Sequence, residues 1–204
     1  STIGTHLNWG SSYLVNDFYK RFVRPEASEK DMVLMGRLST VILMVLAGAL
    51  SLLFLEDATQ AFNILLLSGA GSGAIYLLRW FWWRINAWTE VVAMVVATVN
   101  AFILVLWVND LWLANTFAGV YPLPAGYQEM GVKALSGTVF PIKLIIALVV
   151  TTIAWLAATR LTKPETPETL RSFYRLTRPG GPGWQKVVDE ARADGDLIDE
   201  KDHG

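Results

Sequence analysis

The amino-acid sequence predicts an all-α membrane protein, and three observations support this class. Hydrophobic residues make up 53% of the 204 residues, and the mean hydropathy is +0.38. Only 17% of the residues are charged, well below the roughly one quarter that is typical of a soluble domain. The polar residues also cluster between long apolar runs, which is typical of helices that cross a bilayer.

Four apolar segments are each long enough to span a membrane, which takes about 20 helical residues. Within residues 23–161 they cover about 32–55, 58–78, 86–108 and 139–161, with a Pro- and Gly-containing loop over 109–138. Ahead of them, residues 1–22 are too polar for a lipid-facing span. They predict a partly buried helix, or the end of a span that begins upstream. Ser28, with Asp31 three residues later, predicts a capped helix start before the first span.

The basic residues predict how the spans are oriented. They gather before the first span, between the second and third, and after the fourth: Lys20, Arg21, Arg24, Lys30, Arg79, Arg84, Arg160, Lys163, Arg171, Arg175 and Arg178. The turn between the first two spans has none, and loop 109–138 has only Lys133. The positive-inside rule therefore places the chain start, the second turn and the tail (residues 162–204) in the cytoplasm, and loop 109–138 outside.

The tail is expected to be soluble. Thr166, Pro167 and Glu168 form a typical helix start, and the helix is expected to run to about Leu176. Pro179–Gly183 then interrupts regular structure, and a last short helix is expected to fray toward the chain end.

Nothing in the sequence indicates an enzyme. The only histidines are His6 and His203, there is no cysteine, and no Ser/His/Asp or paired-carboxylate arrangement is visible. The net charge of −1 does not favour a nucleic-acid partner, and no cofactor is expected.

Two groups of residues within the spans have alternative interpretations. Gly69 and Gly73 form a small-xxx-small pattern that favours close helix packing, and the alternative is a flexible point in a moving helix. Glu90 lies just inside the third span, where pairing with Arg79 or Arg84 is favoured over a role in proton transfer.

Ser1 and Thr2 are the candidate metal ligands. Adjacent hydroxyls at a helix start offer two hard oxygens of the kind that Na⁺ prefers, although such pairs more often cap helices.

The first 22 residues resemble the sodium:solute symporter family, which includes the sodium/proline and sodium/sugar symporters. The resemblance rests on Ser1-Thr2, on Ser11-Ser12 ten residues later, and on Asp17-Phe18-Tyr19-Lys20. It continues through Ala27–Lys30, Gly36-Arg37 and Arg79–Trp88, so it extends over nearly the whole chain. His6 stands where relatives often have Gln.

The resemblance implies a partial leucine-transporter-like helical bundle built on inverted repeats. Residues 1–22 would be the cytoplasmic end of the eighth core helix and a following amphipathic helix. The first two spans would be the ninth and tenth core helices, and the last two would be peripheral. Ser1 and Thr2 match the family's sodium-coordinating positions, alongside backbone carbonyls of a first core helix that this sequence lacks.

The function expected from the resemblance is that of the C-terminal part of a Na⁺-coupled secondary transporter in the bacterial inner membrane. Its partners would be Na⁺, a small organic solute (sugar, amino acid or carboxylate), the lipid bilayer and the missing N-terminal helices. The alternatives are the membrane input module of a sensor or signalling protein, which the short tail disfavours, and a self-standing four-helix scaffold. The sequence does not name the solute.

Overall fold

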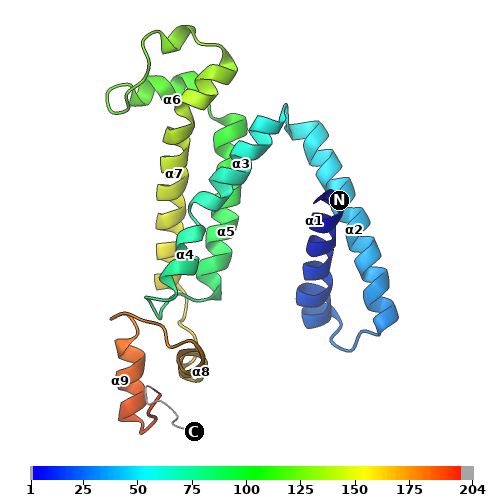
Figure 1. Cartoon of the computed structure of the whole chain (residues 1–204), viewed down its shortest axis with the longest axis vertical. Coiled ribbons are helices and arrows are strands. Elements are labelled where there is room, and N and C mark those ends of the chain that lie inside the picture. The colour runs from blue at the N-terminus through cyan, green and yellow to red at the C-terminus, as the bar shows by residue number, and fades with distance from the viewer. Residues whose placement is uncertain (1, 199–204) are drawn as a thin grey trace. The chain divides into compact units, whose positions relative to one another are not determined.

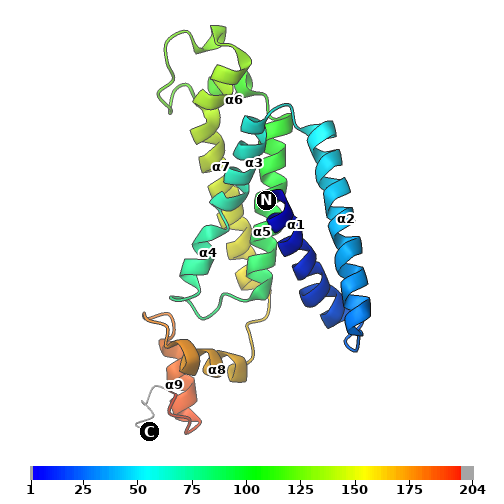
Figure 2. The ribbon, with the colours of Figure 1, turned by 45° about the vertical axis from the view of Figure 1, so that its right-hand side comes forward.

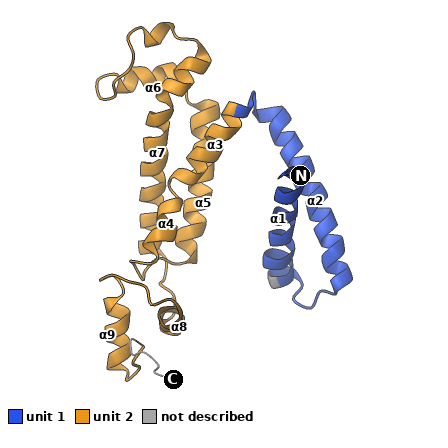
Figure 3. Ribbon diagram, in the orientation of Figure 1, with its two compact units in different colours: residues 1–58 blue, residues 59–204 orange. Residues whose placement is uncertain are grey.

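The computed structural model describes residues 2–198, and it divides the chain into two compact units, residues 1–58 and 59–204 (Figure 3). Four of its helical segments are long and apolar enough to cross a membrane: Glu29–Phe54, Ala58–Leu78, Ala87–Trp107 and Val132–Leu161. The predicted class, an all-α membrane protein with four spans, is therefore confirmed.

The first unit is a helical hairpin. Helix α1 (Thr2–Ser12) continues into the π-helical segment η1 (Tyr13–Val23), and α2 (Glu29–Phe54) returns alongside α1 (Figure 1). The predicted N-cap is confirmed, since the Ser28 hydroxyl accepts a hydrogen bond from the Asp31 amide and the Asp31 carboxylate accepts one from the Ser28 amide. Most apolar side chains of α2 are exposed in the described residues, including Leu34, Leu38 and Val45, so this face requires lipid or further protein around it.

The second unit contains the other three spans. The second span is interrupted, with α3 (Ala58–Ala70) and α4 (Gly73–Leu78) separated by a turn at Gly71 and Ser72. The third span joins α5 (Ala87–Phe102) to the π-helical η2 (Ile103–Trp107), and the fourth is α7 (Val132–Leu161). Ala93, Ala97 and Ala101 are fully buried at a spacing of four residues, which lets α5 pack closely against α7.

Loop 109–138 contains more regular structure than expected. Helix α6 (Asp110–Phe117) and the short 3₁₀ helix η3 (Tyr127–Glu129) lie within it, and α7 begins at Val132 rather than near residue 139. The reason is a local apolar core in which Leu113 and Ala114 of α6 pack against Leu135 and Val139. Burial against α6 extends α7 beyond the stretch whose hydropathy marks the span.

The close helix packing expected at Gly69 and Gly73 occurs at a different glycine. A Cβ built on Gly69 or Gly73 meets nothing within 4 Å in the described residues, whereas a Cβ on Gly71 would overlap the Thr151 side chain. The predicted packing contact is therefore made by the glycine between the two predicted ones. Ile75 lies four residues after Gly71, and Trp155 lies four residues after Thr151. These two residues pack in one buried cluster, so α4 runs parallel to this part of α7 (Figures 1 and 2).

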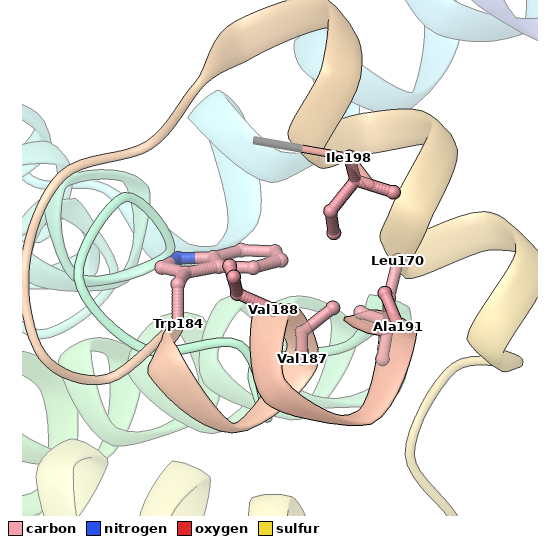
Figure 4. Close-up of a cluster of buried hydrophobic side chains, with 6 residues drawn as sticks. All are labelled: Leu170, Trp184, Val187, Val188, Ala191 and Ile198. Atoms are coloured by element: carbon pink, nitrogen blue, oxygen red, sulfur yellow. The ribbon is translucent and has the colours of Figure 1, made fainter. Parts of the chain in front are cut away.

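The tail folds on a small core of its own. Helices α8 (Pro167–Thr177) and α9 (Gln185–Ala193) bury an apolar cluster that consists of Leu170, Trp184, Val187, Val188, Ala191 and Ile198 (Figure 4). The predicted start of α8 is confirmed, because the Thr166 hydroxyl accepts a hydrogen bond from the Thr169 amide and Pro167 is the first helical residue. After α9, Ile198 is 2% exposed, and the chain end at which fraying is expected lies outside the described residues.

Candidate functional site

The predicted sodium ligands lie at the start of the first helix. Ser1 is outside the described residues. Thr2 is the first residue of α1, and its side chain is exposed. Among the described residues, no cluster of three or more His, Cys, Asp or Glu side chains is placed to hold a metal ion. Ser1 and Thr2 as sodium ligands therefore stay a prediction.

His6 lies one turn after Thr2 and bonds to the backbone rather than to the Thr2 hydroxyl. Its Nδ1 is 2.9 Å from the Thr2 carbonyl oxygen. Since a carbonyl only accepts, Nδ1 carries the proton in this hydrogen bond. The ring also lies 6.1 Å from that of Trp9, centroid to centroid. His6 therefore binds within its own helix and leaves the Thr2 side chain available.

Packing against α2 positions α1. The Ser11 hydroxyl donates to the Gly36 carbonyl oxygen at 2.7 Å, and Ser11 is 4% exposed. At Gly10 a Cβ would lie 2.9 Å from a Leu43 methyl group, so a larger residue there requires the Leu43 side chain to shift. Ser12, in contrast, is exposed and accepts a hydrogen bond from Asn16. Of the Ser11-Ser12 pair, only Ser11 contributes to helix packing among the described residues.

Polar residues near the turn between α4 and α5 connect the ends of α4, α5 and α7. Glu90 pairs with Arg79 at 2.9 Å, as predicted. Arg84 instead donates to the carbonyl oxygens of Thr159 and Arg160, at 3.1 and 3.2 Å, in the last turn of α7. A cation at a helix C-terminus satisfies carbonyls that have no partner within the helix. These contacts give Glu90 and Arg84 structural roles.

Asn86 connects the start of α5 to the end of α7. It is 4% exposed, accepts from the Thr89 amide at 3.0 Å, and donates to the Thr162 hydroxyl at 2.8 Å and the Lys163 carbonyl at 2.9 Å. The Thr89 and Thr159 hydroxyls, both fully buried, lie 3.0 Å apart. The sequence did not predict this network. The Asn86–Thr89 spacing is a helix-start signal, but its partners on α7 are remote in sequence.

Charged groups stabilise the fold of the tail. Arg171 pairs with Asp194 and Asp196, and Arg175 also pairs with Asp196. The hydrogen bond to Asp194 raises the pKa of the Arg171 guanidinium. A backbone hydrogen bond at the start of α8 and a side-chain hydrogen bond with Thr166 lower the pKa of Glu168. The folded pKa of Glu168 lies below its unfolded value, so its stabilising contribution is present at neutral pH and is lost as the pH falls through the folded pKa.

Comparison with known families places α1 and the first three spans in one group of proteins. The model of the sodium:solute symporter family matches residues 1–115, which is more than half of the chain. The matched region contains Thr2, the α1–α2 hairpin, the interrupted second span and the Arg79–Glu90 pair. The chain belongs to the sodium:solute symporter family.

Three curated relatives of this chain are bacterial proteins whose names describe proline transport. The chain is 30% identical over 131 residues to the osmoregulated proline transporter OpuE of Bacillus subtilis. It is 32% identical over 109 residues to the sodium/proline symporter of Haemophilus influenzae, and 33% identical over 113 residues to the high-affinity proline transporter PutP of Bacillus subtilis.

These alignments include 62%, 50% and 53% of this chain, but only 25%, 20% and 23% of the respective relatives. The chain thus spans about a quarter of the length of the curated relatives it matches. No solved structure matches it significantly.

Proposed function

We propose that this chain is the C-terminal part of a Na⁺-coupled secondary transporter that takes up a small organic solute by alternating access. The family match over residues 1–115 is the observation that carries the proposal, because it includes the candidate sodium-binding helix together with three membrane-spanning segments. Sodium coupling requires an ion site whose occupancy differs between transport states.

The proposed sodium ligands are the hydroxyl oxygens of Ser1 and Thr2. Support comes from their match to the family pattern and from the exposed position of Thr2 at the start of α1. Two hydroxyls do not complete the oxygen shell of an alkali cation. In the family arrangement, backbone carbonyls of a first core helix provide the remaining oxygens, and transporter folds commonly bind Na⁺ with such unwound carbonyls.

The proposed solute is an amino acid, with proline as the first candidate. The names of the three relatives support this choice over a sugar or a carboxylate. The proposed orientation follows the basic residues, with the α4–α5 turn and the tail in the cytoplasm of a bacterial cell. Nothing in the described residues favours the alternative of a sensor input module.

Proline uptake driven by a sodium gradient tests this function. The full-length gene product in proteoliposomes is expected to accumulate radiolabelled proline when an inward Na⁺ gradient is imposed, because ion binding and solute binding are coupled in a symporter. An equal K⁺ gradient is expected to give no accumulation, as are empty liposomes under a Na⁺ gradient. Equal uptake under both gradients contradicts sodium coupling, while sodium-dependent uptake of another solute contradicts only the choice of proline.

A further inference from the structure

The tail is docked on the turn that follows α4. Trp82 in this turn forms a parallel backbone bridge with Gly183 of the tail. A Cβ on Gly183 would overlap the Phe81 carbonyl oxygen, and the overlap is with backbone, which cannot rotate away. Gly181 has a φ of 100°, a conformation that favours glycine. Docking therefore depends on glycine at the contact itself.

Aromatic and basic side chains extend the docking contact. Within the tail the rings of Phe173 and Trp184 stack with their centroids 5.4 Å apart, and across the contact the ring of Trp80 in the turn lies 6.4 Å from that of Phe173. Lys186 of the tail lies 5.0 Å above the ring of Trp83 in the turn. Such cation–π contacts are attractive at this distance. The tail thus contacts the Trp80 and Trp83 rings of the turn as well as its backbone.

The docking contact is not fully packed. A half-open cavity of about 280 Å³ lies between the turn, the start of α5 and the tail, where it is lined by Arg79, Trp83, Glu90, Phe173 and Trp184 among others. The indole N–H of Trp184 is buried and has no hydrogen-bond partner among the described residues. Missing contacts and an unpaired polar atom both make an interface easier to separate.

Helix α4 is a short segment held at both ends. At one end the interruption at Gly71 and Ser72 removes helical continuity with α3, and Gly71 packs on Thr151 of α7. Thr151 is fully buried, and its hydroxyl has no hydrogen-bond partner among the described residues. At the other end, α4 stops at Leu78, and the turn on which the tail docks through Trp82 follows directly. Between these ends, Ile75 is 1% exposed against Trp155.

We propose that the tail acts as a latch on α4. While Gly183 is docked on the turn, α4 is held against α7. When the tail is released, α4 moves about the interruption at Gly71 and Ser72, and Ile75 becomes accessible. Interruptions of this kind are points at which a helix bends or swings. This inference concerns the tail and does not depend on the ion or solute that is transported.

Thiol labelling in the full-length protein tests the latch. Ile75→Cys is introduced with any upstream cysteines replaced, since residues 1–204 contain none. Gly183→Ala is then compared with Gly180→Ala, a matched control in the same loop, where a Cβ meets nothing within 4 Å. Labelling with N-ethylmaleimide is expected to be about tenfold faster in Gly183→Ala than in the control, because a buried thiol reacts only when its segment opens.

Two readings overturn the latch. In the first, trypsin cuts after Lys186 faster in Gly183→Ala than in the control, but the labelling rates of the two variants are equal. The tail is then released without any change in the accessibility of residue 75 on α4. The other is unchanged trypsin protection, because Gly183 then does not hold the tail. If Gly183→Ala does not accumulate in the membrane, Trp184→Ala takes its place, since it removes the stacked ring of the tail without altering a span. The labelling rate at residue 75 and trypsin cleavage after Lys186 then test the latch in the same way.

Discussion

Replacing Lys143 with methionine is expected to lower the free energy of unfolding by about 3 kcal/mol, the lower end of the range for breaking a buried ion pair. Lys143 lies within α7 and is 3% exposed, and its Nζ is 2.6 Å from the Asp110 carboxylate at the start of α6. Apart from Lys143, the contacted Asp110 oxygen has no hydrogen-bond partner among the described residues, so methionine leaves a largely buried charge without its cation. Unfolding of the full-length product in detergent, followed by denaturant titration, measures the loss.

Two variants serve as controls for this prediction. Lys133→Met changes an exposed lysine on the same helix and is expected to stay within about 0.5 kcal/mol of the parent, as is usual for surface substitutions. Asp110→Leu combined with Lys143→Met removes both charges and is expected to recover most of the stability. If the double variant is as unstable as Lys143→Met alone, the loss comes from packing and the ion pair is not its cause.

Substitution of the three glycines in the second span is expected to give effects of opposite sign. Gly71→Ala places a Cβ into the Thr151 side chain and is expected to destabilise the protein by about 1–3 kcal/mol, the usual cost of overpacking. Gly69→Ala and Gly73→Ala meet open space and are expected to be neutral or stabilising by up to about 1 kcal/mol, since alanine is the better helix former. Thermal unfolding of the three variants under identical conditions measures the difference.

The glycine series distinguishes the structure from the small-xxx-small interpretation. If Gly69→Ala and Gly73→Ala destabilise while Gly71→Ala does not, the close approach occurs at the outer pair, and the contact with Thr151 is wrong. If all three destabilise, helices outside residues 1–204 pack at the outer pair as well, and the predicted contrast between the glycines is contradicted.

Local signals in the sequence predicted much of the fold. Apolar runs of sufficient length identified the four spans, and short-range patterns identified the helix starts at Ser28 and Thr166. The Arg79–Glu90 pair was also predictable, because both residues flank one short turn. In each case the interacting groups are close in sequence.

Contacts between distant segments could not be predicted from the same patterns. Asp110 and Lys143 were visible only as a charge after one span and a charge inside another, and nothing local links them. Gly183 was read as part of a break in regular structure, although its lack of a side chain is required by Phe81 on a different turn. The position of Gly71 opposite Thr151 likewise depends on how two helices align.

The candidate sodium site was the feature least predictable from the residues alone. Composition and spacing favour a helix cap at Ser1 and Thr2, and only the family resemblance raises them to ion ligands. The structure adds that Thr2 begins α1 and that His6 bonds to its carbonyl rather than its hydroxyl. These observations make the Thr2 hydroxyl the atom to remove in a decisive experiment.

The most direct test is the sodium dependence of solute uptake by the full-length product carrying Thr2→Ala, with Thr2→Ser as the matched control. Loss of one charge–dipole contact to a bound ion is expected to raise the sodium concentration for half-maximal uptake about tenfold or more, as for loss of a hydrogen bond to a charged group. Thr2→Ser retains the hydroxyl and is expected to stay close to the parent. If Thr2→Ala retains the sodium affinity of the parent, Thr2 does not bind the coupling ion.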